Sequence, residues 1–441
     1  MGFAEVVNSA PKLKLGSPTE YEQPYLLGFR GLLVIETFLW TFLRTFAPTT
    51  VYVSDDPNGP FSYQIVRKIF SVLFWNEYFL YGAIIFLSAR SIAIPFIRNP
   101  KAERAAMSMM CRGITLWFPV AVSVAIATLA FSVGGIDYIA EFKTKTSNHT
   151  AAVPYVIPNA FAYFNSVFNM FWTTRDYNIQ AASTAFPSGT LWMICAVYMQ
   201  SYTVYMTMLI IPYTRNKWRV QGAFCFVLCA WWVQSWAWFT ISGLVLADMV
   251  MNMKFKERAQ RGVPVWRRAD GSQIRIPVFV PAGLCLIGGL LMQYLWVAYR
   301  PDLFDKEWLV HTDPYYTPSL NVQYATRHTQ ARDDAYLMVI GIFILLESYD
   351  ILQRIFSNGF LVALGKRSLS YFLIQSNMMY IVGIRVFNSL YTKHHISFGG
   401  SNMVALITCL VITIPLAELF YRLVELPSKG LAHRFYDFIT A

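Results

Sequence analysis

Apolar runs long enough to cross a bilayer recur along this chain of 441 residues, and short polar segments separate them. The first run, 26–47, has about twenty residues, which is enough for a transmembrane helix. Similar runs continue to residue 422 and predict ten spans. The expected spans are 27–46, 69–94, 114–133, 190–212, 220–234, 236–251, 277–299, 335–356, 360–388 and 403–422. We therefore expect an all-α, polytopic membrane helix bundle of about ten transmembrane helices.

The same pattern divides the chain into three parts. Residues 1–25 form a polar arm that lacks the apolar core of a signal peptide, so we expect a cytosolic arm. Residues 26–422 form one membrane domain, and residues 423–441 form a cytosolic tail. An even number of spans places both termini on one side of the membrane.

Composition and charge exclude several classes of protein. Hydrophobic residues make up 56% of the chain and charged residues only 14%, which is not typical of a soluble enzyme. The net charge of +11 comes largely from Lys and Arg in short loops, which is the pattern that orients membrane proteins. We expect membrane lipids as partners and no nucleic acid. The expected location is an integral membrane of the secretory pathway or the plasma membrane.

Loop and cysteine patterns add three expectations. The sequon Asn148-His149-Thr150 falls on the expected outer side and predicts a glycan on Asn148. The segment 155–172 is aromatic but interrupted by proline, which indicates a helix at the membrane interface rather than a span. The six cysteines lie in or beside apolar runs with no Cys-x-x-Cys pair, so we expect neither disulfides nor a metal site.

Five short motifs occur in order along the chain. They are 26–32 (LLGFRGL), 111–119 (CRGITLWFP), 187–194 (PSGTLWMI), 364–374 (LGKRSLSYFLI) and 425–428 (ELPS). Together they resemble the acyltransferase-3 family of multi-pass membrane proteins, in particular its fungal branch. The resemblance implies a ten-span fold. It also implies transfer of an acyl group, often acetyl, from an acyl-CoA co-substrate to a hydroxyl of a lipid, sugar or natural product.

The resemblance implies catalytic residues that this chain replaces. A histidine that acts as general base is expected eleven residues after Arg30, where this chain has Thr41. A glutamate is expected where this chain has Val197, and a second histidine where it has Gln375. All six histidines lie in expected loops or in the tail. These replacements argue against the ordinary acyl-transfer mechanism.

Ionisable residues inside the expected spans are the remaining candidates for chemistry. Glu36 is the candidate replacement base, if it does not instead form a buried pair with Arg90 or Arg385. Asp248 is the second candidate acid, and solvation at a helix end is its competing explanation. By the resemblance, arginines near the cytosolic face hold the phosphates of the donor, and the candidates are Arg30, Arg90 and Arg112. Contact of Arg30 with lipid headgroups is the alternative for that residue.

Three hypotheses remain open. The first is an acyltransferase with an atypical site, which uses Glu36 or an outer-loop histidine such as His311 and takes a hydrophobic or glycan acceptor. The second is a catalytically inactive family member that serves as scaffold or subunit for a membrane-protein partner. The third is non-acyl chemistry such as terpenoid cyclisation in an aromatic-walled cavity. Aromatic residues at the membrane interface are the simpler explanation of the tryptophans of 231–238.

Overall fold

The computed structural model describes residues 23–51, 59–148, 150–172, 180–267, 273–300 and 331–440. Helices dominate these residues. The helices of the first half are α2 (Pro24–Phe46), α3 (Phe61–Phe74), α4 (Glu77–Arg98), α5 (Ala102–Gly134), α6 (Asp137–Thr146), α7 (Ala160–Trp172), α8 (Ala181–Ala185), α9 (Trp192–Met208) and α10 (Asn216–Trp232). Those of the second half are α11 (Ala237–Asn252), α12 (Phe255–Arg261), α13 (Phe279–Tyr294), α16 (Asp333–Ser348), α17 (Asp350–Phe356), α18 (Gly359–Lys366), α19 (Ser368–Met378), α20 (Ile384–Asn388), α21 (Phe398–Phe420) and α22 (Leu426–Thr440). Short 3₁₀ or π turns are η2 (Pro48–Thr50), η3 (Pro187–Gly189), η4 (Ile211–Tyr213), η5 (Leu295–Tyr299), η7 (Met379–Gly383), η8 (Ser389–Lys393) and η9 (Tyr421–Glu425).

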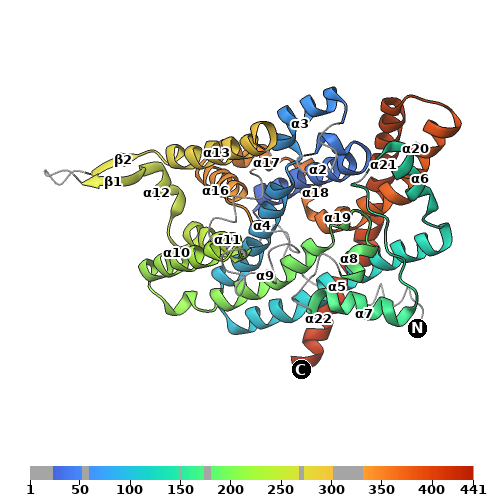
Figure 1. Ribbon diagram of the computed structural model, residues 1–441. Coiled ribbons are helices and arrows are strands. Elements are labelled where there is room, and N and C mark those ends of the chain that lie inside the picture. The colour runs from blue at the N-terminus through green and yellow to red at the C-terminus, as the bar shows by residue number, and fades with distance from the viewer. Residues whose placement is uncertain are drawn as a thin grey trace, which may run out of the picture.

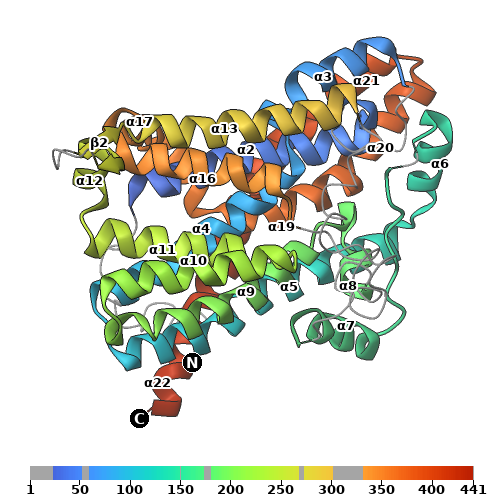
Figure 2. The same ribbon diagram turned by 60° about the vertical axis from the view of Figure 1, so that its left-hand side comes forward.

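The chain forms an all-α bundle whose long helices run across one another in layers (Figures 1 and 2). In the part of the chain that the structure describes, six helices are long and apolar enough to cross a membrane. A seventh is counted if α16 and α17, which meet at an angle of 103°, form one broken span. The other three expected spans correspond to shorter or interrupted helices: α10, α11 and the segment from α18 to α20. The helical class is confirmed, and seven of the ten expected spans correspond to helices or a bent helix pair that are long and apolar enough to cross a membrane.

Two boundaries differ from the expected pattern for identifiable reasons. The second expected span divides into α3 and α4 because Asn76 caps α4: its side chain accepts a hydrogen bond from the Phe79 N–H at 3.3 Å. The basic loop between α12 and α13 contains two antiparallel strands, β1 (Val263–Arg267) and β2 (Gln273–Ile276). This hairpin projects from the bundle at the left of Figure 1. The hydrophobic pattern alone does not predict it.

The N-terminal third of α5 and the C-terminal segment form a helix pair that the sequence analysis did not anticipate. Helix α5 begins at Ala102, so Arg112 lies inside a helix and not in a loop. The segment expected to be a tail forms α22, which packs along α5 (Figure 1). The Cys111 Sγ donates to the Ala432 carbonyl at 3.4 Å, and the Tyr436 hydroxyl donates to the Glu103 carbonyl at 3.4 Å.

Helices α2 and α18 are in backbone contact because glycines line their interface. A Cβ on Gly31 would lie 2.0 Å from the Leu361 carbonyl oxygen, and a Cβ on Gly365 would lie 1.8 Å from that of Leu27. No side chain larger than hydrogen fits at such distances. Both glycines belong to motifs identified in the sequence, 26–32 and 364–374. The two motifs therefore encode one helix–helix contact.

Helix α19 connects further motifs in the core. Its Ser376 hydroxyl lies 2.9 Å from the hydroxyl of Ser188, in the 187–194 motif. Its Ser370 hydroxyl donates to the carboxylate of Glu425, in the 425–428 motif, at 2.6 Å. Its Asn377 side chain donates to the Ser123 hydroxyl of α5 at 3.1 Å. Four of the five motifs thus meet along the α18–α19 segment. Helix packing therefore explains why these motifs occur together although they lie far apart in the sequence.

Candidate functional site

Two arginines from distant parts of the chain meet over one face of α4. From α5, the Arg112 guanidinium donates to the Ser88 hydroxyl at 2.8 Å and to the Ser201 hydroxyl at 3.1 Å. From α2, Arg30 donates to the Leu87 carbonyl at 3.3 Å and to the hydroxyl of Ser91. Ser88 and Ser91 lie three residues apart in one helix, so their side chains share a face. We call this group the Arg30–Arg112 site.

The electrostatics of this site favour an anion. Within the described residues, Arg112 hydrogen-bonds only to hydroxyls and forms no ion pair with a carboxylate. Arg30 lies close enough for its positive charge to act on Arg112. Hydroxyl groups do not neutralise a guanidinium, and the positive charge of Arg30 nearby raises the cost of the charge on Arg112. A phosphate would supply a counter-charge to Arg112 and accept hydrogen bonds from it.

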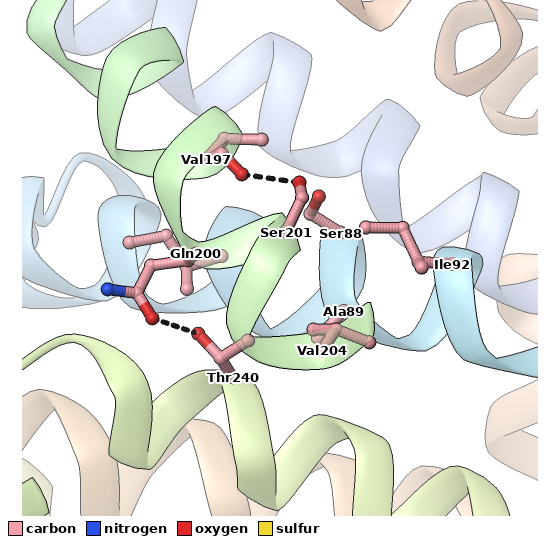
Figure 3. A pocket seen from close by; sticks show the side chains of 9 residues that line it. Ser88, Ala89, Ile92, Val197, Gln200, Ser201, Val204 and Thr240 are labelled. Carbon is pink, nitrogen blue, oxygen red and sulfur yellow. Dashed lines mark hydrogen bonds between the residues drawn. The ribbon is translucent and has the colours of Figure 1, made fainter. Parts of the chain in front are cut away.

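A small pocket adjoins Arg112, lined by side chains of α4, α9 and α11 (Figure 3). Both serines that Arg112 contacts, Ser88 and Ser201, line it, and the Thr240 hydroxyl donates to the Gln200 side chain across it at 3.3 Å. Val197, where the resemblance implies a glutamate, lines it as well. The surrounding side chains leave no room for a water molecule, so the pocket is a packing gap beside Arg112, and a ligand group would enter it only if these side chains moved.

No family model, curated protein or solved structure matches this chain. The resemblance to acyltransferase-3 proteins therefore rests on the five motifs, and the site is interpreted from its own geometry.

Arg90 is held elsewhere and does not join the other two arginines. Its guanidinium forms an ion pair with Glu347 at 2.7 Å, and the two side chains are 0% and 1% exposed. The Tyr25 hydroxyl donates to the same carboxylate at 2.9 and 3.0 Å. The expected pairing of Glu36 with Arg90 is therefore wrong. The donor-binding role expected of Arg90 is also disfavoured, because a buried carboxylate already neutralises it.

The other expected partner of Glu36, Arg385, lies at an exposed helix end. It donates to the Gly134 carbonyl at 3.0 Å and lies over the Tyr138 ring at 4.5 Å. Glu36 itself is buried, with 8% exposure, and no hydrogen bond or ion pair joins it to the described residues. It lies on α2 six residues beyond Arg30, about 9 Å along the helix axis. Six residues also turn the helix so that Glu36 and Arg30 lie about 120° apart around its axis. Glu36 is the candidate base because it is buried and has no counter-charge among the described residues.

Asp248 has a complete set of partners. Its carboxylate accepts two hydrogen bonds from Arg219, at 3.0 and 3.1 Å, and one from Asn252 at 2.5 Å. This ion pair joins α10 to α11 and neutralises the carboxylate. The geometry supports a structural role for Asp248 in the hairpin of these helices, so we do not include it among the reacting groups.

The implied catalytic positions carry no base in the structure. The Thr41 hydroxyl donates to the Thr37 carbonyl of its own helix at 2.8 Å, and the Gln375 side-chain oxygen is buried without a hydrogen-bond partner in the described part of the chain. His311, the alternative base, lies outside the described residues. The serines of the Arg30–Arg112 site were missed by the sequence analysis. Single serines in apolar helices carry no recognisable pattern, and only the packing of α4 against α5 and α9 brings them together.

Asn148, the expected glycan acceptor, is 3% exposed. Its amide nitrogen donates to the Thr45 carbonyl at 2.6 Å, and its side-chain oxygen accepts from the N–H of Thr150 and of Ala151. The Thr150 hydroxyl donates to the Arg44 carbonyl at 2.9 Å. The sequon thus satisfies carbonyls at the C-terminal end of α2, which lack partners within the helix. The fold leaves no room for a glycan on that nitrogen.

We predict that the folded protein carries no glycan on Asn148. Treatment with an endoglycosidase should leave its electrophoretic mobility unchanged. Asn148→Ala should lower the free energy of unfolding by about 1–3 kcal/mol, because the Thr45 carbonyl loses its donor. Asn159→Ala, which removes an exposed turn contact to Ala162, is the matched control and should have a smaller effect. A mobility shift in the folded, monodisperse fraction would contradict the assignment.

Proposed function

We propose that this chain is an atypical membrane acyltransferase of the acyltransferase-3 type, which binds an acyl-CoA through the Arg30–Arg112 site. The observation that carries the proposal is the convergence of Arg30 and Arg112 on serine hydroxyls, with no carboxylate paired to Arg112 among the described residues. Such a pair suits the phosphates of the donor.

The reaction needs a base near the reacting atoms, and we assign that role to Glu36. Its carboxylate would take the proton of the acceptor hydroxyl as the oxygen attacks the thioester carbonyl. The new C–O bond forms and the C–S bond breaks. The proton passes from Glu36 to the leaving thiolate, which restores the carboxylate. This chain supplies no other buried carboxyl so close to Arg30 along α2.

The proposal includes the finer topology expected from the sequence. Ten spans with both termini cytosolic would place the beginnings of α2 and α5, and hence Arg30 and Arg112, towards the cytosol, where acyl-CoA is found. The distribution of Lys and Arg in short loops supports this orientation. The second, acyl-accepting substrate would approach from the membrane or the opposite side.

The proposed donor site makes a direct prediction. Coenzyme A and acetyl-CoA should bind the detergent-purified chain and raise its melting temperature, because a ligand of the folded state stabilises it. Arg112→Gln should weaken that binding at least tenfold, since it removes charge-assisted contacts worth about 1.5–3 kcal/mol each. Calorimetric titration measures both. Arg385→Gln, at the exposed helix end, is the matched control and should bind like the wild type.

If coenzyme A did not bind at millimolar concentration, the proposed donor site would be refuted. An equal loss of affinity in Arg112→Gln and Arg385→Gln would refute it as well. Catalysis is tested separately with Glu36→Gln, which keeps the size of the side chain but not its basicity. If this variant binds coenzyme A normally and transfers no acyl group, the base assignment holds.

A binding or scaffold role without catalysis is the second candidate function. It is favoured by the absence of a base at Thr41, Val197 and Gln375, the positions that the resemblance makes catalytic. Under that role Glu36→Gln has no functional effect, and a membrane-protein partner co-purifies with both forms. Cyclisation of a terpenoid gains no support from the pocket, because aliphatic and small polar side chains line it and no aromatic ring does.

A further inference from the structure

A second cluster, which donor binding does not use, lies at the other end of α2. Arg44 is in the last turn of the helix, and its guanidinium lies over the Trp40 ring, 5.2 Å from the centroid. Trp40 packs edge-on against Tyr81 at 5.8 Å, and Tyr81 packs against Trp192 at 4.7 Å. Glu77 accepts a hydrogen bond from the Tyr81 hydroxyl at 2.8 Å. We call these five residues the Arg44 cluster.

Two donors in this cluster, the Arg44 guanidinium and the Trp40 indole N–H, lack acceptors among the described residues. In the part of the chain that the structure describes, the Arg44 guanidinium has the ring of Trp40 beneath it but no hydrogen bond and no ion pair. Trp40 is 1% exposed, and its indole N–H is buried without a partner. Glu77 is near enough for its charge to act on Arg44 but lies outside ion-pair distance. Such donors at a partly buried place cost free energy unless an acceptor arrives.

The chemistry of the cluster selects the ligand. A guanidinium binds phosphate or carboxylate through parallel hydrogen bonds, and the rings beside it form an apolar wall. Arg44 is partly exposed while Trp40 and Tyr81 are buried, so an anionic group at Arg44 would have its apolar part against the rings. The carboxylate of Glu77 disfavours a second negative charge. The cluster therefore suits one anionic group on an uncharged, apolar body.

The position of the cluster relates it to Glu36. Glu36, Trp40 and Arg44 follow one another at intervals of four residues, so they share one face of α2. Eight residues separate Glu36 from Arg44, which is about 12 Å along the axis. A ligand held at Arg44 and extended along Trp40 would bring its far end to Glu36. Arg30 lies on the other side of Glu36 along the helix.

We infer that the Arg44 cluster binds the acyl-accepting substrate, an amphiphile that carries one phosphate or carboxylate and an apolar body ending in a hydroxyl. The anionic group pairs with Arg44, the apolar body lies along Trp40, and the hydroxyl reaches Glu36. Binding at Arg44 stands on the geometry of the cluster alone. The role as acceptor rests on the proposed function.

Binding is tested on the full, detergent-purified chain with three probes: farnesyl monophosphate, farnesol and inorganic phosphate. Farnesyl monophosphate should bind and raise the melting temperature, and the other two should bind at least tenfold more weakly, because each lacks one half of the recognised chemistry. Arg44→Gln should weaken binding of farnesyl monophosphate at least tenfold. Arg44→Lys, which keeps the charge but loses the parallel hydrogen bonds, should weaken it less and guards against misfolding.

Arg112→Gln is the matched control, and it should bind farnesyl monophosphate like the wild type while losing coenzyme A. Competition by phosphatidic acid in phosphatidylcholine nanodiscs would identify a bilayer lipid as the source of the anionic group, and absence of competition would identify an amphiphile from outside the bilayer. Equal binding by wild type and Arg44→Gln would overturn the inference. If Arg112→Gln lost binding of farnesyl monophosphate and Arg44→Gln kept it, the inference would also be overturned. The proposed donor site would not be affected by that result.

Discussion

Glu347→Ala should destabilise the protein by about 3–5 kcal/mol, the cost of leaving a buried charge without its partner. The carboxylate lies 2.7 Å from the Arg90 guanidinium, and both side chains are excluded from solvent. The Tyr25 hydroxyl would lose its acceptor at the same time. The midpoint of denaturant or thermal unfolding, measured in detergent or in lipid nanodiscs, gives the effect.

Two controls separate this effect from a general loss of charge. Asp350→Ala removes a carboxylate that pairs with Lys256 at the surface, where both side chains are at least 40% exposed, and it should cost less than about 1 kcal/mol. The double variant Arg90→Met with Glu347→Leu should recover most of the loss, because apolar side chains then fill the space. If Glu347→Ala were as stable as the wild type, the pair of Arg90 and Glu347 would not be buried in the folded protein.

Gly31→Ala should cost about 3 kcal/mol or more, at the upper end of what overpacked interfaces show. The added methyl group would lie 2.0 Å from the Leu361 carbonyl oxygen, and the atom it meets belongs to the backbone of α18. A backbone atom cannot rotate away as a side chain can. Helices α2 and α18 would have to separate, which would also shift Arg30. We therefore expect a lower melting temperature together with weaker binding of coenzyme A.

The matched control is Gly222→Ala in α10, where an added Cβ meets nothing within 4 Å. Alanine favours a helix over glycine by about 1 kcal/mol, so this variant should be as stable as the wild type or slightly more stable. If both alanine variants behaved alike, the close contact between α2 and α18 would be refuted.

The expected helices came from length and apolar content, and those properties are local. They located α2 within a few residues, and they placed the hairpin of α10 and α11 where the structure has it. They failed where local chemistry interrupts a run. Asn76 and Glu77 form an N-terminal helix signal inside the second apolar run. Asp270-Gly271, between alternating residues of the basic loop, is a recognised hairpin signal to which apolar content is blind.

The site was predictable only in part. Arg30 and Arg112 were identified as donor arginines because their motifs drew attention to them, and the structure brings both to α4. The ion pair of Arg90 with Glu347 was not foreseen, because nothing in the spacing of residues indicates which distant helices are neighbours. The Arg44 cluster was missed for the same reason. Its rings come from α2, α4 and α9, and each alone looks like an ordinary apolar residue.

The long-range contacts have a consequence for biogenesis. Tyr25 and Glu347 are 322 residues apart in the chain, and Cys111 and Ala432 are 321 residues apart. During synthesis, α4 therefore enters the membrane with the Arg90 guanidinium uncompensated, long before α16 is made. The early helices must be retained by the insertion machinery or stay tilted towards water until the second half arrives. We expect ribosome-arrested chains that stop before α16 to be recognised by quality control, whereas chains that include α16 should escape it.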